Sequence, residues 1–385
     1  MTRERINAEW VFAPNTQAVC RALTDGGAQA LFVGGCVRNA LLEVPLRDID
    51  ISTDAVPERV IELVEAAGLK AVPTGIAHGT VTVVAGHEGF EVTTFRRDVA
   101  TDGRRAVVAF STEVADDAAR RDFTMNALYA RPDGTVLDPL GGMPDLEARR
   151  VRFIGNAHDR LHEDYLRALR YFRFHAWYGD HDAGMDPEAL AAIGDALDGL
   201  DKISRERVGH EMHRFLEAVN PAPSVAAMRQ CGALGALLPG ADDRAMAPLI
   251  HLEGEAGVKP DAARRLAALG GGWVAESLRL PKAEIKRIDR IRTAAEEIQS
   301  PEEMGYRLKA DARDGWLLRC ALTETPWHGE DGLAAGRAAR FPLKARDLMP
   351  DLQGPELGDT LERLENLWIA SGFTLTRDEL FAQRG

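Results

Sequence analysis

The sequence predicts an α+β protein, in which a small mixed sheet with helices is followed by an all-helical remainder. Short β-rich runs separated by glycine turns recur between residues 31 and 95, and such runs are typical of strands. Beyond Gly179, most segments instead show the apolar spacing of helices. We therefore expect the sheet within residues 1–150 and helices in the rest of the chain.

The composition is that of a globular protein with room for several domains. The chain has 385 residues, of which 45% are hydrophobic and 28% are charged. It has no run of 18 apolar residues and no signal-peptide core at its N-terminus, so we expect no membrane span. Its four cysteines are widely spaced without a C-x-x-C pair, which predicts reduced thiols and a cytoplasmic protein.

The formal net charge of −13 restricts how a nucleic acid could bind. A polyanion needs clustered lysine and arginine side chains, because they replace the counterions of its phosphates. Any such partner must therefore be met by local basic surface within an acidic whole.

The stretch 31–54, LFVGGCVRNALLEVPLRDIDISTD, predicts a strand, a glycine turn, a helix and a second strand. The first apolar run ends at Gly34 and Gly35, and a helix is expected at residues 39–43. Glycines let the backbone approach a ligand closely, and a helix N-terminus offers free N–H groups to an anion. Arg38 adds a positive charge beside this turn, which therefore suits a phosphate.

Two carboxylates follow on the second strand. Asp48 and Asp50 are two residues apart, so their side chains share one face of a strand. Paired carboxylates beside a phosphate-binding turn suit one or two Mg²⁺ ions that hold a triphosphate. Each feature alone is also typical of plain packing or a solvated strand edge, but their order favours nucleotidyl transfer. Glu91, on a later β-rich run, is either a third carboxylate of this site or an ordinary strand-edge residue.

These motifs resemble those of the tRNA nucleotidyltransferase and bacterial poly(A) polymerase family. The string GGCVRNALL followed by DIDIST is similar to the family signature GGxxRDxLL…DxDxxT. Asn39 stands where the family usually has Asp, and Asn can still accept a hydrogen bond. The resemblance implies that Gly35 and Arg38, with Gly34 as a further candidate, hold the triphosphate.

The string RRDFTMNA at residues 120–127 matches the family motif RRDFTxNA. By its residues alone, it could be a helix start capped by salt bridges. The resemblance instead implies that Arg121 contacts the nucleotide and that three neighbours support it: Arg120, Asp122 and Asn126. Between these motifs, residues 98–117 are expected to form a mobile loop, similar to the flexible loop of CCA-adding enzymes that is needed for the terminal A.

Residues 159–177 predict one continuous helix. Asp164 precedes Arg167 by three residues, and Arg170 and Arg173 follow at the same interval, so we expect all four on one face. Such a ladder could be a solvated, salt-bridged surface. It could also read a base, because a carboxylate accepts from an exocyclic amine and a guanidinium donates to a ring nitrogen. Cytosine and adenine both present this amine and ring nitrogen, whereas uracil and guanine do not.

The string EDYLR at residues 163–167 resembles the EDxxR motif of class II, bacterial-type CCA-adding enzymes. The resemblance implies that Asp164 and Arg167 read the incoming base, with Glu163 as a further candidate. It also implies that Arg170 and Arg173 support the nucleotide and its phosphates.

The resemblance extends to the helical half, where the segment 337–373 is similar to the family's tRNA-holding tail. It implies four parts: a nucleotidyltransferase catalytic head at 1–150, a helical neck with the base-reading helix at 151–220, a helical body at 221–300 and a tRNA-binding helical tail at 301–385. A basic helix at 281–297 is either a solvated face or a phosphate contact.

The predicted function is that of an enzyme, a CCA tRNA nucleotidyltransferase. The tRNA 3′-hydroxyl would attack the α-phosphate of CTP or ATP, with Asp48 and Asp50 as catalytic and Mg²⁺-binding residues. The rivals are a poly(A) polymerase or a CC-only or A-only enzyme of the same family, a small-molecule nucleotidyltransferase, and a non-catalytic RNA-binding protein.

Overall fold

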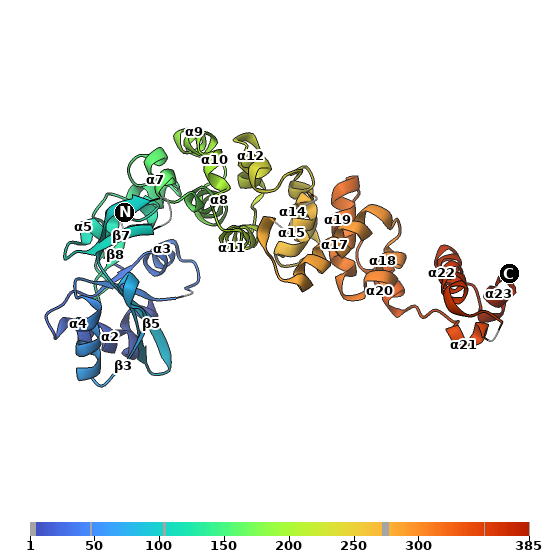
Figure 1. Cartoon of the computed structure of the whole chain (residues 1–385), viewed down its shortest axis with the longest axis horizontal. Helices are drawn as coiled ribbons and strands as arrows, with labels where there is room; N and C mark the ends of the chain where they lie inside the picture. Colours follow the sequence, from blue (N-terminus) through green and yellow to red (C-terminus); the bar gives the residue numbers. More distant parts are fainter. Residues whose placement is uncertain (1–4, 47, 103–104, 272–276, 350, 385) are drawn as a thin grey trace. The chain divides into compact units, whose positions relative to one another are not determined.

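The computed structural model describes residues 5–46, 48–102, 105–271, 277–349 and 351–384. The chain forms two compact units, residues 1–237 and 238–385 (Figure 1). The predicted division into head, neck, body and tail stays a prediction. Among the helices of the described chain, none combines the length and apolar character that a membrane span requires.

The first unit is built around a seven-stranded mixed sheet, which confirms the predicted α+β class. The strand order is β3-β4-β5-β2-β1-β8-β9. β2 and β5 run parallel, and every other neighbouring pair is antiparallel. The strands are β1 (Leu31–Val33), β2 (Asp50–Thr53), β3 (Lys70–Gly75), β4 (Thr80–Ala85), β5 (Glu88–Thr94), β8 (Tyr129–Ala130) and β9 (Val136–Leu137).

Two helices cover the strands β4 and β5, namely α2 (Pro14–Thr24) and α4 (Pro57–Ala66). Figure 1 shows them near β5 in the N-terminal part. In β4, buried and half-buried side chains alternate, as a strand covered on one face requires. Both helices carry proline in the first turn, where its missing N–H costs no hydrogen bond. This packing fixes the sheet in which β2 begins at Asp50, with Asp48 just before the strand.

The other helices of this unit range from single turns to the 13 residues of α8. They include 3-10 helices, labelled η. Their bounds are α1 (Glu9–Phe12), α3 (Gly35–Leu42), η1 (Ile76–His78), α5 (Val114–Ala119), η2 (Thr124–Asn126), α6 (Met143–Glu147), α7 (Ala157–Glu163), α8 (Leu166–Tyr178), α9 (Pro187–Asp195), α10 (Leu197–Leu200), α11 (Arg205–Leu216), α12 (Ala222–Gln230) and α13 (Ala233–Leu237). Helix α3 begins at Gly35, four residues before the expected start, so its first turn directly follows the strand β1.

The expected loop at residues 98–117 is wrong, because much of it is regular structure. β6 (Arg96–Asp102) and β7 (Arg105–Phe110) form a separate antiparallel sheet, and α5 follows. Residues 103–104 lie outside the described residues. The run RAVVAF is rich in β-branched and apolar residues, and an Asp-Gly pair is a common hairpin signal. The sequence interpretation gave the charges too much weight.

The single helix expected at residues 159–177 is also wrong. Helix α7 ends at Glu163, and α8 begins at Leu166. Asp164 between them has an extended backbone, and its Oδ1 accepts a hydrogen bond from the backbone N–H of Leu166 at 3.1 Å. An aspartate often caps a helix in this way, in competition with continuing the preceding one. Asp164 therefore does not share a helical face with Arg167.

The second unit is wholly helical in its described residues. Its helices are α14 (Met246–Glu255), α15 (Ala262–Leu269), α17 (Lys282–Glu297), α18 (Pro301–Leu308), η3 (Lys309–Asp311), α19 (Ala312–Thr323), α20 (Asp331–Ala338), α21 (Ala345–Leu348), α22 (Gly354–Ala370) and α23 (Arg377–Ala382). Leu364 and Trp368 of α22 are buried in the apolar core of the tail segment. On the basic helix α17, Arg287 and Arg290 form ion pairs with aspartates of the same unit.

Candidate active site

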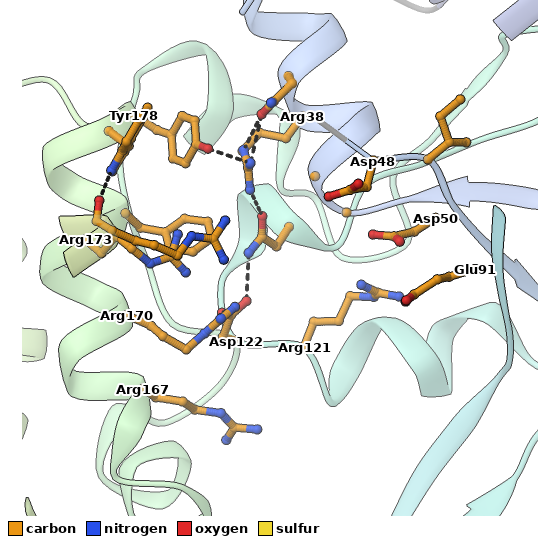
Figure 2. A pocket seen from close by; sticks show the side chains of 18 of the residues that line it. Arg38, Asp48, Asp50, Glu91, Arg121, Asp122, Arg167, Arg170, Arg173 and Tyr178 are labelled. Carbon is orange, nitrogen blue, oxygen red and sulfur yellow. Dashed lines mark hydrogen bonds and ion pairs between the residues drawn. The ribbon is translucent and has the colours of Figure 1, made fainter. Parts of the chain in front are cut away.

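The predicted site residues meet in one cavity of the first unit, with a volume of about 720 Å³. Fourteen of the fifteen predicted residues line it, and only Glu163 does not. Figure 2 shows Asp48, Asp50 and Glu91 across the cavity from the arginines of α8. The structure thus brings together residues that the sequence interpretation placed on separate strands, turns and helices.

One wall of the cavity carries three carboxylates. Asp50 opens β2 and lies opposite Glu91 of β5 in the parallel register, while Asp48 precedes the strand. Burial raises the pKa of Asp50 to about 6, and the negative charges of Glu91 and Asp48 add to this shift, although Arg121 opposes it. This wall therefore holds more negative charge than the protein itself neutralises.

The glycine turn lies beside this wall. Gly34 has φ 68° and ψ −120°, a backbone conformation that is essentially restricted to glycine. A Cβ built on it would lie 3.2 Å from Nη1 of Arg121, which is closer than an ordinary contact. Helix α3 starts at the next residue, and both glycines line the cavity. The turn therefore places a helix N-terminus at the cavity, where it can receive an anion.

Arg38 of α3 is buried and has only uncharged hydrogen-bond partners. It donates to Asn126 Oδ1 at 2.5 Å, to Asn39 Oδ1 at 2.8 Å and to the Tyr178 hydroxyl at 2.9 Å. Its guanidinium carbon also lies 3.9 Å from the centre of the Tyr178 ring. Burial lowers the pKa of Arg38, and Tyr178 and Asp122 partly offset the shift. Asn39 thus positions Arg38 without neutralising its charge. A bound anion could neutralise that charge.

A chain of polar contacts connects Arg38 to the arginines of α8. Asn126 Nδ2 donates to Asp122 Oδ1 at 2.9 Å, and Arg170 Nε donates to Asp122 Oδ2 at 2.8 Å. Arg170 also lies 3.7 Å from Glu211 Oε1 of α11, which accepts from Arg173 Nε at 2.6 Å. Although burial raises the pKa of Asp122, Arg170 and the hydrogen bonds outweigh it and hold that pKa well below its ordinary value. The network joins α3, η2, α8 and α11 into one frame.

Arg121 is fixed by a second cluster. Its guanidinium donates to Asp117 Oδ2 at 2.9 Å and to the Tyr129 hydroxyl at 3.0 Å, and Arg120 pairs with Asp117 at 3.0 Å. Burial opposes ionisation of Asp117, but the two arginines prevail and lower its pKa to about 2. Arg121 is therefore held at the cavity by a carboxylate that stays ionised.

Asp164 and Arg167 each have a separate partner. Asp164 Oδ2 accepts from Arg207 Nη2 of α11 at 2.7 Å. Arg167 pairs with Glu163, which also pairs with Arg160 at 2.5 Å. Glu163 therefore contacts Arg167 without lining the cavity itself.

Several residues at this site were missed by the sequence interpretation, among them Trp177, Tyr178, Asp117 and Glu211. Arg207, Glu211 and Arg214 follow one another at intervals of four and three residues, so they share a face of α11. That spacing was a usable signal. Tyr178 gave none, because its contact with Arg38 joins residues 140 positions apart.

A mixed sheet with paired aspartates, a glycine turn at a helix N-terminus and an arginine-lined cavity are the parts that a nucleotidyltransferase requires. A family model for the Poly A polymerase head domain matches residues 30–152, and one for the probable RNA and SrmB-binding site of polymerase A matches residues 184–244. The mouse mitochondrial CCA tRNA nucleotidyltransferase 1 is 31% identical over 370 residues, which cover 91% of this chain and 85% of that protein. The chain therefore belongs to the CCA tRNA nucleotidyltransferase family, which confirms the resemblance.

Other relatives agree with this assignment. The human mitochondrial CCA tRNA nucleotidyltransferase 1 is 45% identical over 184 residues, a match that spans 48% of this chain and 42% of that protein. The crystal structure of the Bacillus stearothermophilus CCA-adding enzyme in complex with CTP superposes with a TM-score of 0.68 at 27% identity and covers 94% of both chains. The structural match thus includes residues of both the first and the second unit.

Proposed function

We propose that this nucleotidyltransferase adds C, C and A to the 3′ end of tRNA from CTP and ATP, without a nucleic-acid template. The observation that carries the proposal is that Asp48 and Asp50 line the same cavity as Asp164 and Arg167. In the reaction, the tRNA 3′-hydroxyl oxygen forms a bond to the α-phosphorus, and the bond to the departing pyrophosphate breaks. The names of the relatives support this activity.

Nucleotidyltransferases of this kind generally use a divalent metal, which we propose is Mg²⁺. Within the described residues, no group of three or more His, Cys, Asp or Glu side chains is arranged to hold a metal ion. Mg²⁺ commonly takes only one or two protein carboxylates and completes its shell with substrate phosphates and water. Asp48 and Asp50 fit this role, because both line the cavity on the wall that also carries Glu91. When bound, the ion lowers the pKa of the attacking hydroxyl and balances charge on the leaving pyrophosphate.

The turn and the arginines hold the triphosphate in this proposal. Gly34 and Gly35 bring the N-terminus of α3 to the phosphates, and Arg38 supplies a charge that lacks a carboxylate partner. Arg121, anchored through Asp117, adds a second charge. These groups are already in place, so binding requires little reorganisation.

Base selection falls to Asp164 and Arg167. A carboxylate can accept from the exocyclic amine of cytosine or adenine, and a guanidinium can donate to the adjacent ring nitrogen. Arg207 pairs with Asp164 and Glu163 pairs with Arg167, so each of these partners can orient one of the two side chains. Arg170 pairs with Asp122, and Arg173 pairs with Glu211. We assign both arginines to support of the bound nucleotide and of the polar network that joins α3, η2, α8 and α11.

An incorporation assay tests this proposal. The full chain is given tRNA that lacks CCA, with each labelled nucleoside triphosphate in turn, and with or without Mg²⁺. We expect metal-dependent incorporation of C, and of A once two C residues are present, with none for the Asp48→Ala variant. Long A tails on generic RNA would favour a poly(A) polymerase, and tight RNA binding without incorporation would favour a non-catalytic protein.

We also propose a cytoplasmic location and a tRNA-binding role for the tail. All four cysteines are free thiols in the structure, in accord with a reducing compartment. Fractionation of the source cells with an antibody against the chain tests the location. Lys344 and Arg346 are two exposed cations at the start of α21, and loss of tRNA binding when their charges are removed tests the tail.

A further inference from the structure

Two of the arginines at the cavity differ from the others in their partners. Seven arginines line it, and five of them pair with carboxylates of the protein. Arg38 has only the uncharged partners described above. The guanidinium of Arg214 has no hydrogen bond or ion pair with any part of the chain that the structure describes.

Arg214 lies on α11, which packs along α8. Its backbone carbonyl accepts a hydrogen bond from the Trp177 indole N–H at 2.7 Å. Tyr178, the residue after Trp177, accepts a hydrogen bond from Arg38 with its hydroxyl, and the Arg38 guanidinium also lies over its ring. The two arginines are therefore connected through consecutive residues at the C-terminal end of α8. Burial, together with repulsion from Arg170 and Arg214, lowers the pKa of Arg173, although Glu211 opposes this shift.

Such an arrangement is unusual in an acidic chain. Acidic residues number 60 against 47 lysines and arginines, so carboxylate partners are plentiful. Partly buried guanidinium groups without a partner are costly unless an anion joins them. A guanidinium offers a planar fork of donors that fits a phosphate group, and an aromatic side chain beside it offers a stacking face to a base.

We propose that Arg214 and Arg38 form a phosphate-binding subsite at the α8 end of the cavity, with Arg214 as its unassigned member. The inference rests on the proposed function, because the bound phosphate belongs to a substrate of that reaction. Two sources share this chemistry. One is the β- and γ-phosphates of the nucleoside triphosphate, and the other is a backbone phosphate near the 3′ end of the acceptor RNA.

The test compares the full-length wild type with Arg214→Gln, Arg214→Lys and the control Arg59→Gln. Arg59 is exposed on α4, pairs with Glu62 and does not line the cavity. Calorimetry gives the dissociation constants of CTP and of inorganic pyrophosphate. Binding of tRNA lacking CCA is measured over a range of salt concentrations, and thermal melting verifies that each variant is folded.

If the nucleotide supplies the phosphate, Arg214→Gln weakens CTP and pyrophosphate binding by about 10- to 100-fold, and Arg214→Lys recovers part of the loss. If the RNA supplies it, the salt dependence of tRNA binding becomes shallower by about one phosphate contact, and CTP binding is unchanged. Unchanged values for CTP, pyrophosphate and tRNA in a folded Arg214→Gln protein would overturn the subsite. Because these are equilibrium measurements, they remain informative if the wild type fails to incorporate nucleotides, which would instead count against the proposed function.

Discussion

The carboxylate of Asp164 lies 2.7 Å from the guanidinium of Arg207, whereas Arg167, three residues further on, pairs with Glu163. Asp164 also caps α8 through its other oxygen. Its orientation is therefore set from two sides, by the start of one helix and by a charge on another. A carboxylate held in this way is preorganised to accept a hydrogen bond from a base, with lone pairs to spare.

Removal of the Arg207 charge should relax base selection. In Arg207→Gln, the Asp164 carboxylate keeps its cap but loses its charged partner, so its orientation becomes less well defined. We expect the preference for CTP over UTP, measured as a ratio of kcat/KM values, to fall about tenfold. Arg59→Gln should leave the ratio at the wild-type value. Wild-type selectivity in Arg207→Gln would show that Arg207 does not position Asp164.

The metal-free protein should gain stability from Asp50→Asn, but only above acidic pH. The folded pKa of Asp50 is raised from 3.8 to about 6, so its charged form disfavours the folded state. That penalty is absent well below pH 3.8, where the carboxyl is protonated in both states, grows as the unfolded state ionises, and is complete once the pH exceeds the folded pKa of about 6. We expect the variant to be more stable at pH 8 by on the order of 2 kcal/mol in urea unfolding, with a much smaller gain at pH 4.

Added Mg²⁺ supplies the control for this prediction. It should stabilise the wild type and leave Asp50→Asn nearly unaffected, because the variant lacks one of the two proposed ligands. An equal gain at both pH values would show that desolvation of the Asp50 carboxylate is not its cause.

The ion pair between Asp122 and Arg170 should show strong energetic coupling. Asp122 is buried and Arg170 is half-buried, and Asp122 receives hydrogen bonds from Asn126 and from Arg170. Removal of one partner leaves the other charge poorly compensated, so Asp122→Asn should cost about 3 kcal/mol of unfolding free energy. Urea unfolding of both single variants, with Arg170→Gln as the second, and of the double variant gives the coupling. Additivity within about 0.5 kcal/mol would contradict a shared network.

Gly34→Ala should impair the site through its backbone. The positive φ and the nearby Arg121 both disfavour a side chain there, so we expect a loss of about 2 kcal/mol of stability. CTP binding should also weaken, because the start of α3 and Arg121 are both displaced. The matched control is Gly235→Ala in α13, where a Cβ meets nothing within 4 Å and the helix should be slightly stabilised. Equal effects of the two variants on CTP binding would refute a special role for the turn.

Local patterns in the sequence predicted much of the site. The spacing of Asp48 and Asp50 correctly predicted that both line one wall, but the prediction that both lie on a strand is wrong, because β2 begins at Asp50 and Asp48 precedes it. It could not show that β2 runs parallel to β5, which brings Glu91 opposite Asp50. That pairing joins residues far apart in the chain, and it arises only when the sheet assembles.

The segment around Asp164 shows where local spacing predicted the wrong structure. The spacing of its apolar residues and arginines fitted one helix. The Asp164 carboxylate instead accepts a hydrogen bond from the backbone N–H of Leu166, and this local bond competes with continuation of the first helix. The break turns Asp164 toward α11, which no spacing within residues 159–177 could reveal. The partners of Arg38 were hidden for the same reason, since they come from η2 and the end of α8.

Sequencing the 3′ ends of tRNA lacking CCA, after reaction with all four nucleoside triphosphates, shows whether side chains of this cavity choose the base. We expect C, C and A followed by arrest for the wild type, and admixed U and G for Asp164→Ala. Ends that are the same for Asp164→Ala and the wild type, or wild-type ends that continue into A tails, would show that they do not.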